Sequence, residues 1–180
     1  MPDRPPDPLS KPLRPSVSGR GEIKAIEPAH HKAILHMNRE FVHWLSPWTQ
    51  EALGYVLARA DYARQIHDGA GVLIGYRHDV DYPDHKNLDW LRAHFEQFFY
   101  IDRIIIARGH HGKGLGRALY LDFEHVARRQ GLPRLVCEVN IKPDNPASHR
   151  FHQALGFHPI GEQDYPRYDV AVRYYEKRLI

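Results

Sequence analysis

Apolar residues along the chain follow two spacings. Spacings of three and four residues predict helices, which fall in the ranges 27–45, 49–59, 88–97, 115–130 and 146–155. Alternating or short continuous apolar runs predict strands in the ranges 21–26, 62–66, 71–77, 100–107, 134–141, 157–161 and 170–178. The strand–helix–strand crossover in the middle implies one parallel pair, whereas the hairpins imply antiparallel pairs. We therefore expect an α/β fold, with a central mixed sheet and helices on both faces.

The first twenty residues stand outside this pattern. Residues 1–20 hold six of the fourteen prolines, which predicts a disordered proline-rich arm before one domain over 21–180. No apolar run approaches the roughly 20 residues of a membrane span, and no hydrophobic signal region is present at the N-terminus. The single Cys137 fits a reducing compartment. We expect a cytoplasmic protein without a membrane partner.

Charge and histidine content exclude two further classes of partner. The net charge is +3, and no dense basic run accompanies it, so we expect no nucleic-acid partner. The chain has 14 His, including the adjacent pairs at 30–31 and 110–111. Neighbouring residues rarely bind one ion together, and no Cys or carboxylate falls at familiar zinc spacing. We expect these histidines on the surface or in loops, and no metal site.

The most informative stretch joins a strand to a helix through a glycine-rich loop. After the strand at 100–107, four glycines follow within eight residues, at positions 109, 112, 114 and 116. Glycines let a backbone approach a ligand closely, and the free N–H groups of a helix N-terminus attract an anion. The stretch therefore predicts a phosphate site at the start of the helix that begins at Leu115.

Spacing decides between the families that place glycines there. A Walker loop needs Ser or Thr after Gly-Lys, but Gly114 follows Lys113; a dinucleotide fingerprint that starts at Gly112 meets Arg117 at its sixth position. The remaining match is HGKGLGRAL at 111–119. It resembles the coenzyme A loop of the GNAT acyltransferases, Arg/Gln-x-x-Gly-x-Gly/Ala, with His111 where the family prefers Arg or Gln.

A second motif strengthens this resemblance. The segment NPASHRFHQALGF, at 145–157, is similar to the GNAT pattern Asn-x-x-Ala-x-x-Phe-Tyr-x-x-x-Gly-Phe. Ser148 replaces the usual Ala, and His152 replaces the usual Tyr. Asn145 is also a good N-cap, with Pro146 at the first helical position. Two motifs in the right order on the right elements imply the GNAT fold for residues 21–180.

The resemblance implies acetyl-CoA as the acyl donor. It places the pantetheine along the end of the strand at 100–107 and the pyrophosphate on the N–H groups of the glycine loop, a position that the helix dipole also favours. Lys113 is equally consistent with solvated surface. The implied coenzyme A residues are Ile104, Ile106, Ala107, His111, Gly112, Lys113, Gly114, Leu115, Gly116, Arg117, Asn145 and Ser148.

Acetyl transfer to an amine also requires a base for the nitrogen, a donor for the oxyanion and a proton for the thiolate. The resemblance implies a backbone N–H near Ile106 as the oxyanion donor. It also places His152 where the family's Tyr approaches the sulfur, and a histidine titrates near neutrality and could donate that proton. The alternative is that His152 only packs or forms hydrogen bonds in its helix.

The base has two candidate residues, Asp102 and Glu138, and ordered water is an alternative to both. On a regular strand, Asp102 shares one side with Tyr100, Ile104 and Ile106. A carboxylate among Ile side chains is costly to bury unpaired, so Asp102 either has a distant ionic partner or lines the pocket. Tyr174 and Tyr175 are reserve acids near the C-terminus.

Together these features predict an acetyl-CoA-dependent N-acetyltransferase that acetylates the amine of a small-molecule or amino-acid-like acceptor by direct attack. Two alternatives stay open. One is a protein N-terminal or lysine acetyltransferase. The other is a non-catalytic acyl-CoA sensor, which is suggested by His152 in place of the family's Tyr. Trp44 and Trp48 either pack between two helices or wall the acceptor pocket. The sequence identifies neither the acceptor nor the oligomeric state, although dimers are common in the family.

Overall fold

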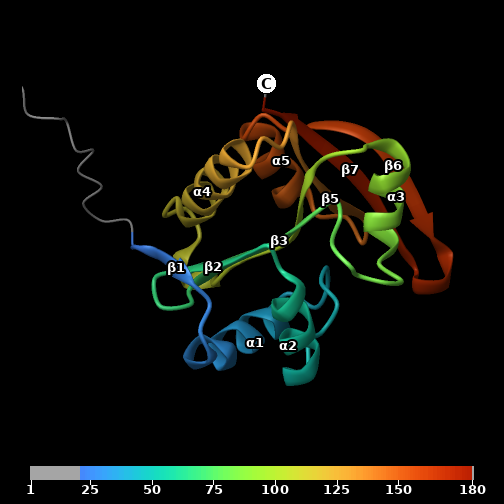
Figure 1. The fold of residues 1–180 in the computed structure, drawn as a ribbon. Helices are drawn as coiled ribbons and strands as arrows, with labels where there is room; N and C mark the ends of the chain where they lie inside the picture. Colours follow the sequence, from blue (N-terminus) through green and yellow to red (C-terminus); the bar gives the residue numbers. More distant parts are fainter. Residues whose placement is uncertain (1–20, 180) are drawn as a thin grey trace, which may run out of the picture.

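The computed structural model describes residues 21–179, which form one seven-stranded mixed sheet with the strand order β1-β2-β3-β4-β5-β7-β6 (Figure 1). The strands are β1 (Ile23–Ala25), β2 (Tyr62–Ile66), β3 (Gly71–Arg77), β4 (Phe99–Ile106), β5 (Arg134–Lys142), β6 (His158–Tyr165) and β7 (Val170–Arg178). The helices are α1 (His31–Glu40), α2 (Gln50–Arg59), α3 (Lys86–His94), α4 (Leu115–Arg129) and α5 (Pro146–Ala154). Only β4 and β5 pair in parallel, and the other five neighbouring pairs are antiparallel. The predicted fold class is confirmed.

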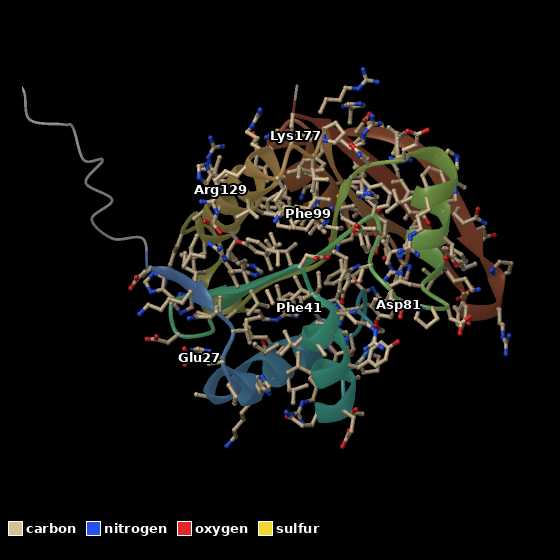
Figure 2. All side chains as sticks on the ribbon, viewed as in Figure 1. Glu27, Phe41, Asp81, Phe99, Arg129 and Lys177 are labelled. Carbon is tan, nitrogen blue, oxygen red and sulfur yellow. The ribbon has the colours of Figure 1, made fainter. Side chains whose placement is uncertain are left out.

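Helices cover both faces of the sheet. On one face, α4 and α5 pack over a core that contains Leu119, Phe123 and Phe99 (Figure 1). On the other face, α1 and α2 cover the part of the sheet near β3 and β4, and α3 covers the part near β5 and β7. Figure 2 shows Phe99 and Phe41 on opposite sides of the sheet, in line with their places in these two cores.

The central strand β4 contains a bulge at Asp102. On β3, Ile74 pairs with Arg103, but the next residue, Gly75, pairs with Ile101, so Asp102 is an extra residue without a partner. Gly75 allows this close approach: a Cβ atom there would lie 2.6 Å from both the Tyr100 carbonyl oxygen and the Phe123 ring. Any side chain at position 75 would therefore push the bulge or α4 away.

The bulge corrects the expected side-chain alternation of this strand. Tyr100 packs in the core beneath α3, whereas Ile104 and Ile106 pack against the core of α4 on the opposite face. The expectation that Asp102, Tyr100, Ile104 and Ile106 share one side is therefore wrong, because it assumed a regular strand. The extra residue reverses the alternation between Tyr100 and Ile104.

The parallel pair β4–β5 opens towards its carboxyl ends. Pairing runs only from Phe99 with Leu135 to Ile101 with Cys137, yet β4 continues to Ile106 and β5 to Lys142. Beyond the bulge the two strands no longer share hydrogen bonds. The opening lies at the middle of the sheet, and residues at the starts of α4 and α5 lie beside it.

Most other expected elements are confirmed, with small changes at their ends. The helix expected at 27–45 is shorter: a 3-10 turn at Pro28–His30 leads into α1, and residues 41–45 form turns. The chain turns back there because Asn38 and Arg103 both donate hydrogen bonds to the Ser46 carbonyl, at 3.1 and 3.0 Å. The expected arm at 1–20 lies outside the described residues. Of the helices described, none is both long and apolar enough to cross a membrane.

Candidate active site

A cavity of about 1120 Å³ occupies the opening between β4 and β5. Its walls come from the loop at 41–47, the start of α3, the ends of β4 and β5, the glycine loop and α5. The sheet divides it, because α4 and α5 lie on one face and α1, α2 and α3 on the other. Substances that enter from the two faces can therefore meet between the strands.

The free edge of β4 offers backbone groups to this cavity. The Ala107 N–H donates to the Ala70 carbonyl at 2.8 Å. Because an antiparallel strand alternates its partners, Ile105 and Arg103 also face β3, and Ile104 and Ile106 turn their N–H and C=O groups towards the opening. This fits the predicted role of Ile104 and Ile106 along an extended ligand. His111 Nε2 donates to the Ile106 carbonyl at 2.7 Å.

Ala107 offers a ligand less than its neighbours on β4. Its N–H is held by Ala70, and its carbonyl accepts the His110 N–H at 2.8 Å. A carbonyl oxygen has a second lone pair, so Ala107 can contact a pantetheine chain only as an acceptor. The N–H groups that face the opening are those of Ile104 and Ile106.

The glycine loop delivers the N-terminus of α4 to the same cavity. Gly112 and Gly114 have φ angles of +73° and +79°, and Gly114 is the N-cap of the helix. The next three N–H groups, of Leu115, Gly116 and Arg117, have no partners within the helix and are free for an anion. Gly112, Gly114, Gly116 and Arg117 line the cavity.

Two of the predicted loop residues contribute less than expected. Leu115 as a whole is 2% exposed and its side chain belongs to the core, so what it can offer a ligand is its backbone N–H at the start of α4. Lys113 is exposed and does not line the cavity. Its position fits the solvated-surface alternative.

The start of α5 forms the opposite wall. Asn145 and Ser148, two of the residues predicted to contact coenzyme A, both line the cavity. Asn145 caps the helix, since its Oδ1 atom accepts the Ser148 N–H at 3.2 Å. The side-chain oxygen of Asn145 is therefore committed to the helix, and its remaining groups are those that can contact a ligand.

His152 is buried, and its environment opposes the predicted acid role. Its Nδ1 atom lies 2.8 Å from the Ser148 carbonyl, which can only accept, so Nδ1 carries the proton. Burial lowers the pKa of His152 to about 4, and the ring is neutral at pH 7. Nε2 must then accept the hydrogen bond from the Tyr120 hydroxyl at 2.6 Å. His152 thus has no proton on the side that faces Tyr120.

Two carboxylates meet on the other face of the sheet. The Tyr100 hydroxyl lies 2.9 Å from Glu138 Oε1 and 3.5 Å from Asp102 Oδ1. His85 Nε2 lies 2.9 Å from the same Asp102 oxygen. Glu138 Oε2 is buried and has no hydrogen-bond partner among residues 21–179. Glu138, Asp102 and His85 all line the cavity, which brings together both predicted bases.

The two carboxylates differ in their affinity for protons. Burial, followed by the charge of Asp102, raises the pKa of Glu138 to about 7. Burial also acts to raise the pKa of Asp102, but the His85 hydrogen bond and the nearby charges of Arg103 and His85 outweigh it, and the net pKa is lowered. Asp102 therefore stays ionised at neutral pH, while Glu138 exchanges its proton there.

The loop between α1 and α2 forms a wall of this part of the cavity. Arg103 donates to the carbonyl and hydroxyl of Ser46 at 3.0 and 2.9 Å and stacks on Trp48 at 3.8 Å. Trp44 Nε1 donates to the Asp144 carbonyl at 3.0 Å, across the opening. Trp48 is thus a packing residue, whereas Trp44 lines the cavity.

The reserve acids proposed from the sequence are not at the cavity. Tyr174 and Tyr175 are both 0% exposed, and neither lines it. Their hydroxyls are held by Asn87 and His149, at 2.9 and 2.8 Å.

Sequence reasoning missed His85, Tyr100 and Tyr120 as site residues. His85 lies in a polar segment that predicts only a loop. Tyr100 and Tyr120 fall on apolar patterns of a strand and a helix, where an aromatic residue usually belongs to the core. Only the hydroxyl partners, which come from distant parts of the chain, distinguish them.

An opened parallel strand pair beside a glycine-rich helix start, with carboxylates behind it, is the arrangement that the resemblance to the GNAT acyltransferases predicts. The sequence model of the acetyltransferase (GNAT) family matches residues 20–157. The chain belongs to this family and is an N-acetyltransferase.

Comparison with individual proteins agrees with this assignment. The chain is 30% identical over 144 residues to the L-methionine sulfoximine/L-methionine sulfone acetyltransferase of Salmonella typhimurium, covering 77% of this chain and 75% of that protein. Ard1 of Thermoplasma volcanium has the same fold, with a TM-score of 0.71, 15% identity and coverage of 89% of this chain and 98% of that one. The structure of yncA of Salmonella typhimurium, solved with its cofactor acetyl-CoA, superimposes with a TM-score of 0.61 at 20% identity, over 88% of this chain and 94% of that one.

Proposed function

We propose that this enzyme transfers the acetyl group of acetyl-CoA to the amine of a small, amino-acid-like acceptor by direct attack, with Glu138 as the general base. The observation that carries the proposal is the unpaired Glu138 Oε2 atom at the opening between β4 and β5. A buried carboxylate oxygen without a partner is costly, and an acceptor ammonium would satisfy it. The relative that acetylates methionine sulfoximine supports the acceptor class.

The donor would occupy the α4–α5 side of the cavity. The free N–H groups of Gly116 and Arg117 and the Arg117 charge suit a diphosphate, because the positive end of the α4 dipole lies there. The open edge of Ile104 and Ile106 suits the amide groups of a pantetheine chain. A backbone N–H on this edge is also our candidate donor to the oxyanion.

The acceptor would enter from the opposite face. Glu138 Oε2 takes a proton from the ammonium, so an N–H bond breaks, an O–H bond forms and the electron pair stays on nitrogen. The amine then attacks the thioester carbonyl, a C–N bond forms and the C–S bond breaks, with its electron pair going to sulfur. The nitrogen also loses a second proton, which balances the proton that the thiolate takes up, so the products are the amide and free coenzyme A thiol. The carboxylate must be ionised to start, which its pKa of about 7 allows near neutral pH.

The experiment that tests the proposal is a screen of acetyl-CoA consumption with the purified protein. The acceptors would be methionine sulfoximine, free amino acids, polyamines, aminoglycosides and a lysine-containing peptide. We expect turnover with an amino-acid-like amine and at least about tenfold lower kcat/KM for its N-methylated or peptide-bound analogue, because the loop at 41–47 forms one wall of the pocket and would meet the added groups. Preferred turnover of the peptide would contradict the acceptor class, and tight acetyl-CoA binding without any turnover would favour a sensor.

Tyr120 takes over the role that the sequence suggested for His152. A developing thiolate is charged and is a stronger hydrogen-bond acceptor than a neutral imidazole, so the Tyr120 hydroxyl can turn from His152 towards the sulfur. We expect Tyr120→Phe to lower kcat by about 100-fold, as the loss of one donor to a developing charge does, with acetyl-CoA affinity unchanged.

The matched comparison is His152→Gln, whose amide oxygen can still accept from Tyr120. We expect a loss of less than about tenfold in kcat for this variant. Steady-state kinetics at saturating acetyl-CoA would measure both. A larger loss for His152→Gln than for Tyr120→Phe would return the acid role to His152.

A further inference from the structure

His85 is the unexpected member of the carboxylate cluster. It is the N-cap of α3, where its Nδ1 atom accepts the Leu88 N–H at 3.3 Å. Its other nitrogen, Nε2, lies 2.9 Å from Asp102 Oδ1, and both side chains are almost buried, at 13% and 12% exposed. Nε2 carries a proton in the neutral ring that caps α3 and also in the charged ring. In either state, His85 donates a hydrogen bond to Asp102.

Asp102 lies on the same side of β4 as Tyr100, two residues before it, so a second carboxylate sits beside Glu138 with the Tyr100 hydroxyl between them. The bulge acts on the residues that follow: it turns Ile104 and Ile106 to the α4 face, away from the two carboxylates. Two carboxylates that share one phenol influence each other's charge.

The other groups around Glu138 hold a fixed charge. On β4, burial lowers the pKa of Arg103, but a guanidinium keeps its proton in proteins, so Arg103 stays charged. The phenols of Tyr100, Tyr120, Tyr165 and Tyr174 and the thiol of Cys137 stay neutral, because burial raises the pKa of each. The described groups that can change charge between pH 5 and 9 beside Glu138 are therefore Glu138 itself and His85.

We propose that His85 and Asp102 are positioning residues for the reaction: His85 holds Asp102 as an anion beside Glu138, and the repulsion between the two carboxylates makes Glu138 a stronger base. The proposal rests on the function proposed above, in which Glu138 takes the acceptor's proton. Neither His85 nor Asp102 exchanges a proton with the acceptor. They act through Glu138, and so their removal changes the pH at which the enzyme works.

The two residues have opposite effects on the proton affinity of the carboxylate pair. Asp102→Asn keeps the shape and can still accept from His85, but it removes the repelling charge. The acid limb of kcat/KM should then move to lower pH by about one unit, and kcat at pH 8 should fall several-fold because the base is weaker. His85→Leu removes a donor that stabilises the two anions. The limb should therefore move to higher pH by roughly half a unit or more.

The experiment measures kcat/KM against pH from 5 to 9 for these two variants and for His85→Gln, whose amide can still donate to Asp102. For His85→Gln we expect kcat/KM to fall on the acid side at the same pH as in the wild type. Circular dichroism should show that all three variants fold. Loss of the α3 cap is a structural effect that would lower activity at every pH without moving the limb. If one of the first two variants fails to fold, the sign of the other still tests the proposal.

Two outcomes separate this proposal from the one on which it depends. If Glu138→Gln is inactive but the limbs of Asp102→Asn and His85→Leu both stay at the wild-type pH, the coupling is refuted and Glu138 remains the base. If Glu138→Gln keeps wild-type turnover, the base assignment itself is wrong. Opposite displacements of the two limbs would establish the coupling, because a merely structural role cannot produce them.

Discussion

Glu138→Gln is expected to lower kcat by about 10²–10⁴-fold, the contribution that a positioned general base makes. The amide keeps the size of the side chain and its contact with the Tyr100 hydroxyl, but it cannot take a proton from an ammonium. Affinity for acetyl-CoA should stay unchanged, because the residues proposed to bind acetyl-CoA lie on the other face of the sheet from Glu138. Steady-state kinetics and calorimetry on one preparation would measure both quantities.

The pH dependence follows from the same carboxylate. The base must be ionised to accept a proton, and the pKa of Glu138 is about 7. Wild-type kcat/KM should therefore fall about tenfold for each pH unit below about 7 and level off above it, and this limb should be absent from the residual activity of Glu138→Gln. A variant with full turnover and an intact limb would transfer the role of base to Asp102 or to water.

Stability gives an independent readout of this substitution. The folded-state pKa of Glu138 lies above its ordinary value of 4.5, so the folded protein binds the proton more tightly than the unfolded chain. Stability from this group is present at low pH and is lost as the pH rises from about 4.5 to 7. A glutamine at position 138 has no proton to lose, so the variant keeps its stability as the pH rises. Glu138→Gln should therefore be more stable than the wild type at pH 8, by at most about 3 kcal/mol.

The matched control is Glu176→Gln, which alters another buried carboxylate away from the cavity. Glu176 is 2% exposed on β7 and pairs with Arg134 at 2.9 Å. Its amide variant leaves Arg134 without its charged partner, so we expect lower stability with kcat unchanged. Thermal unfolding at pH 8 should thus move in opposite directions for the two variants. Equal destabilisation would show that Glu138 serves packing rather than proton transfer.

The sequence predicted the elements of this fold because their apolar periodicities agree with local turn chemistry. Asn145 caps α5 with Pro146 after it, and Gly114 caps α4, as their residue types require. The glycine loop and the motif at 145–157, in the right order on these elements, together pointed to the family. These features are local, and a single sequence displays them directly.

The chemistry of the site depends on contacts that no local pattern displays. The bulge at Asp102 requires Gly75, 27 positions earlier, to let the Tyr100 backbone approach. A regular strand was therefore the natural expectation, and it placed Ile104 and Ile106 on the side of Asp102 and Tyr100, whereas they lie on the opposite face. His152 matches a motif position, from which we expected it to donate a proton. Its partner Tyr120 comes from another helix and donates to His152, so His152 is the acceptor. The chemistry of this site depends on contacts between residues of different elements, whereas periodicity describes one helix or strand at a time.

Gly114→Glu is expected to abolish acetyl-CoA binding without unfolding the protein. Gly114 is the N-cap of α4 at φ +79°, and a Cβ atom there meets nothing within 4 Å, so the new side chain has room to stand over the helix N-terminus. Its carboxylate would occupy the place of the diphosphate and repel it. Like-charge contacts cost several kcal/mol, which corresponds to at least about 100-fold in affinity.

The strain of the substitution can be separated from its charge. A non-glycine residue at positive φ costs roughly 1–2 kcal/mol of stability. Gly131→Glu, just beyond the other end of α4, has a similar φ of +71° and equally open surroundings, but it does not line the cavity. Both variants should lose similar stability in thermal unfolding, and only Gly114→Glu should lose affinity in calorimetry with acetyl-CoA. Wild-type affinity in a folded Gly114→Glu protein would refute the diphosphate site, because a carboxylate cannot share the positive end of the helix with a bound diphosphate at no cost.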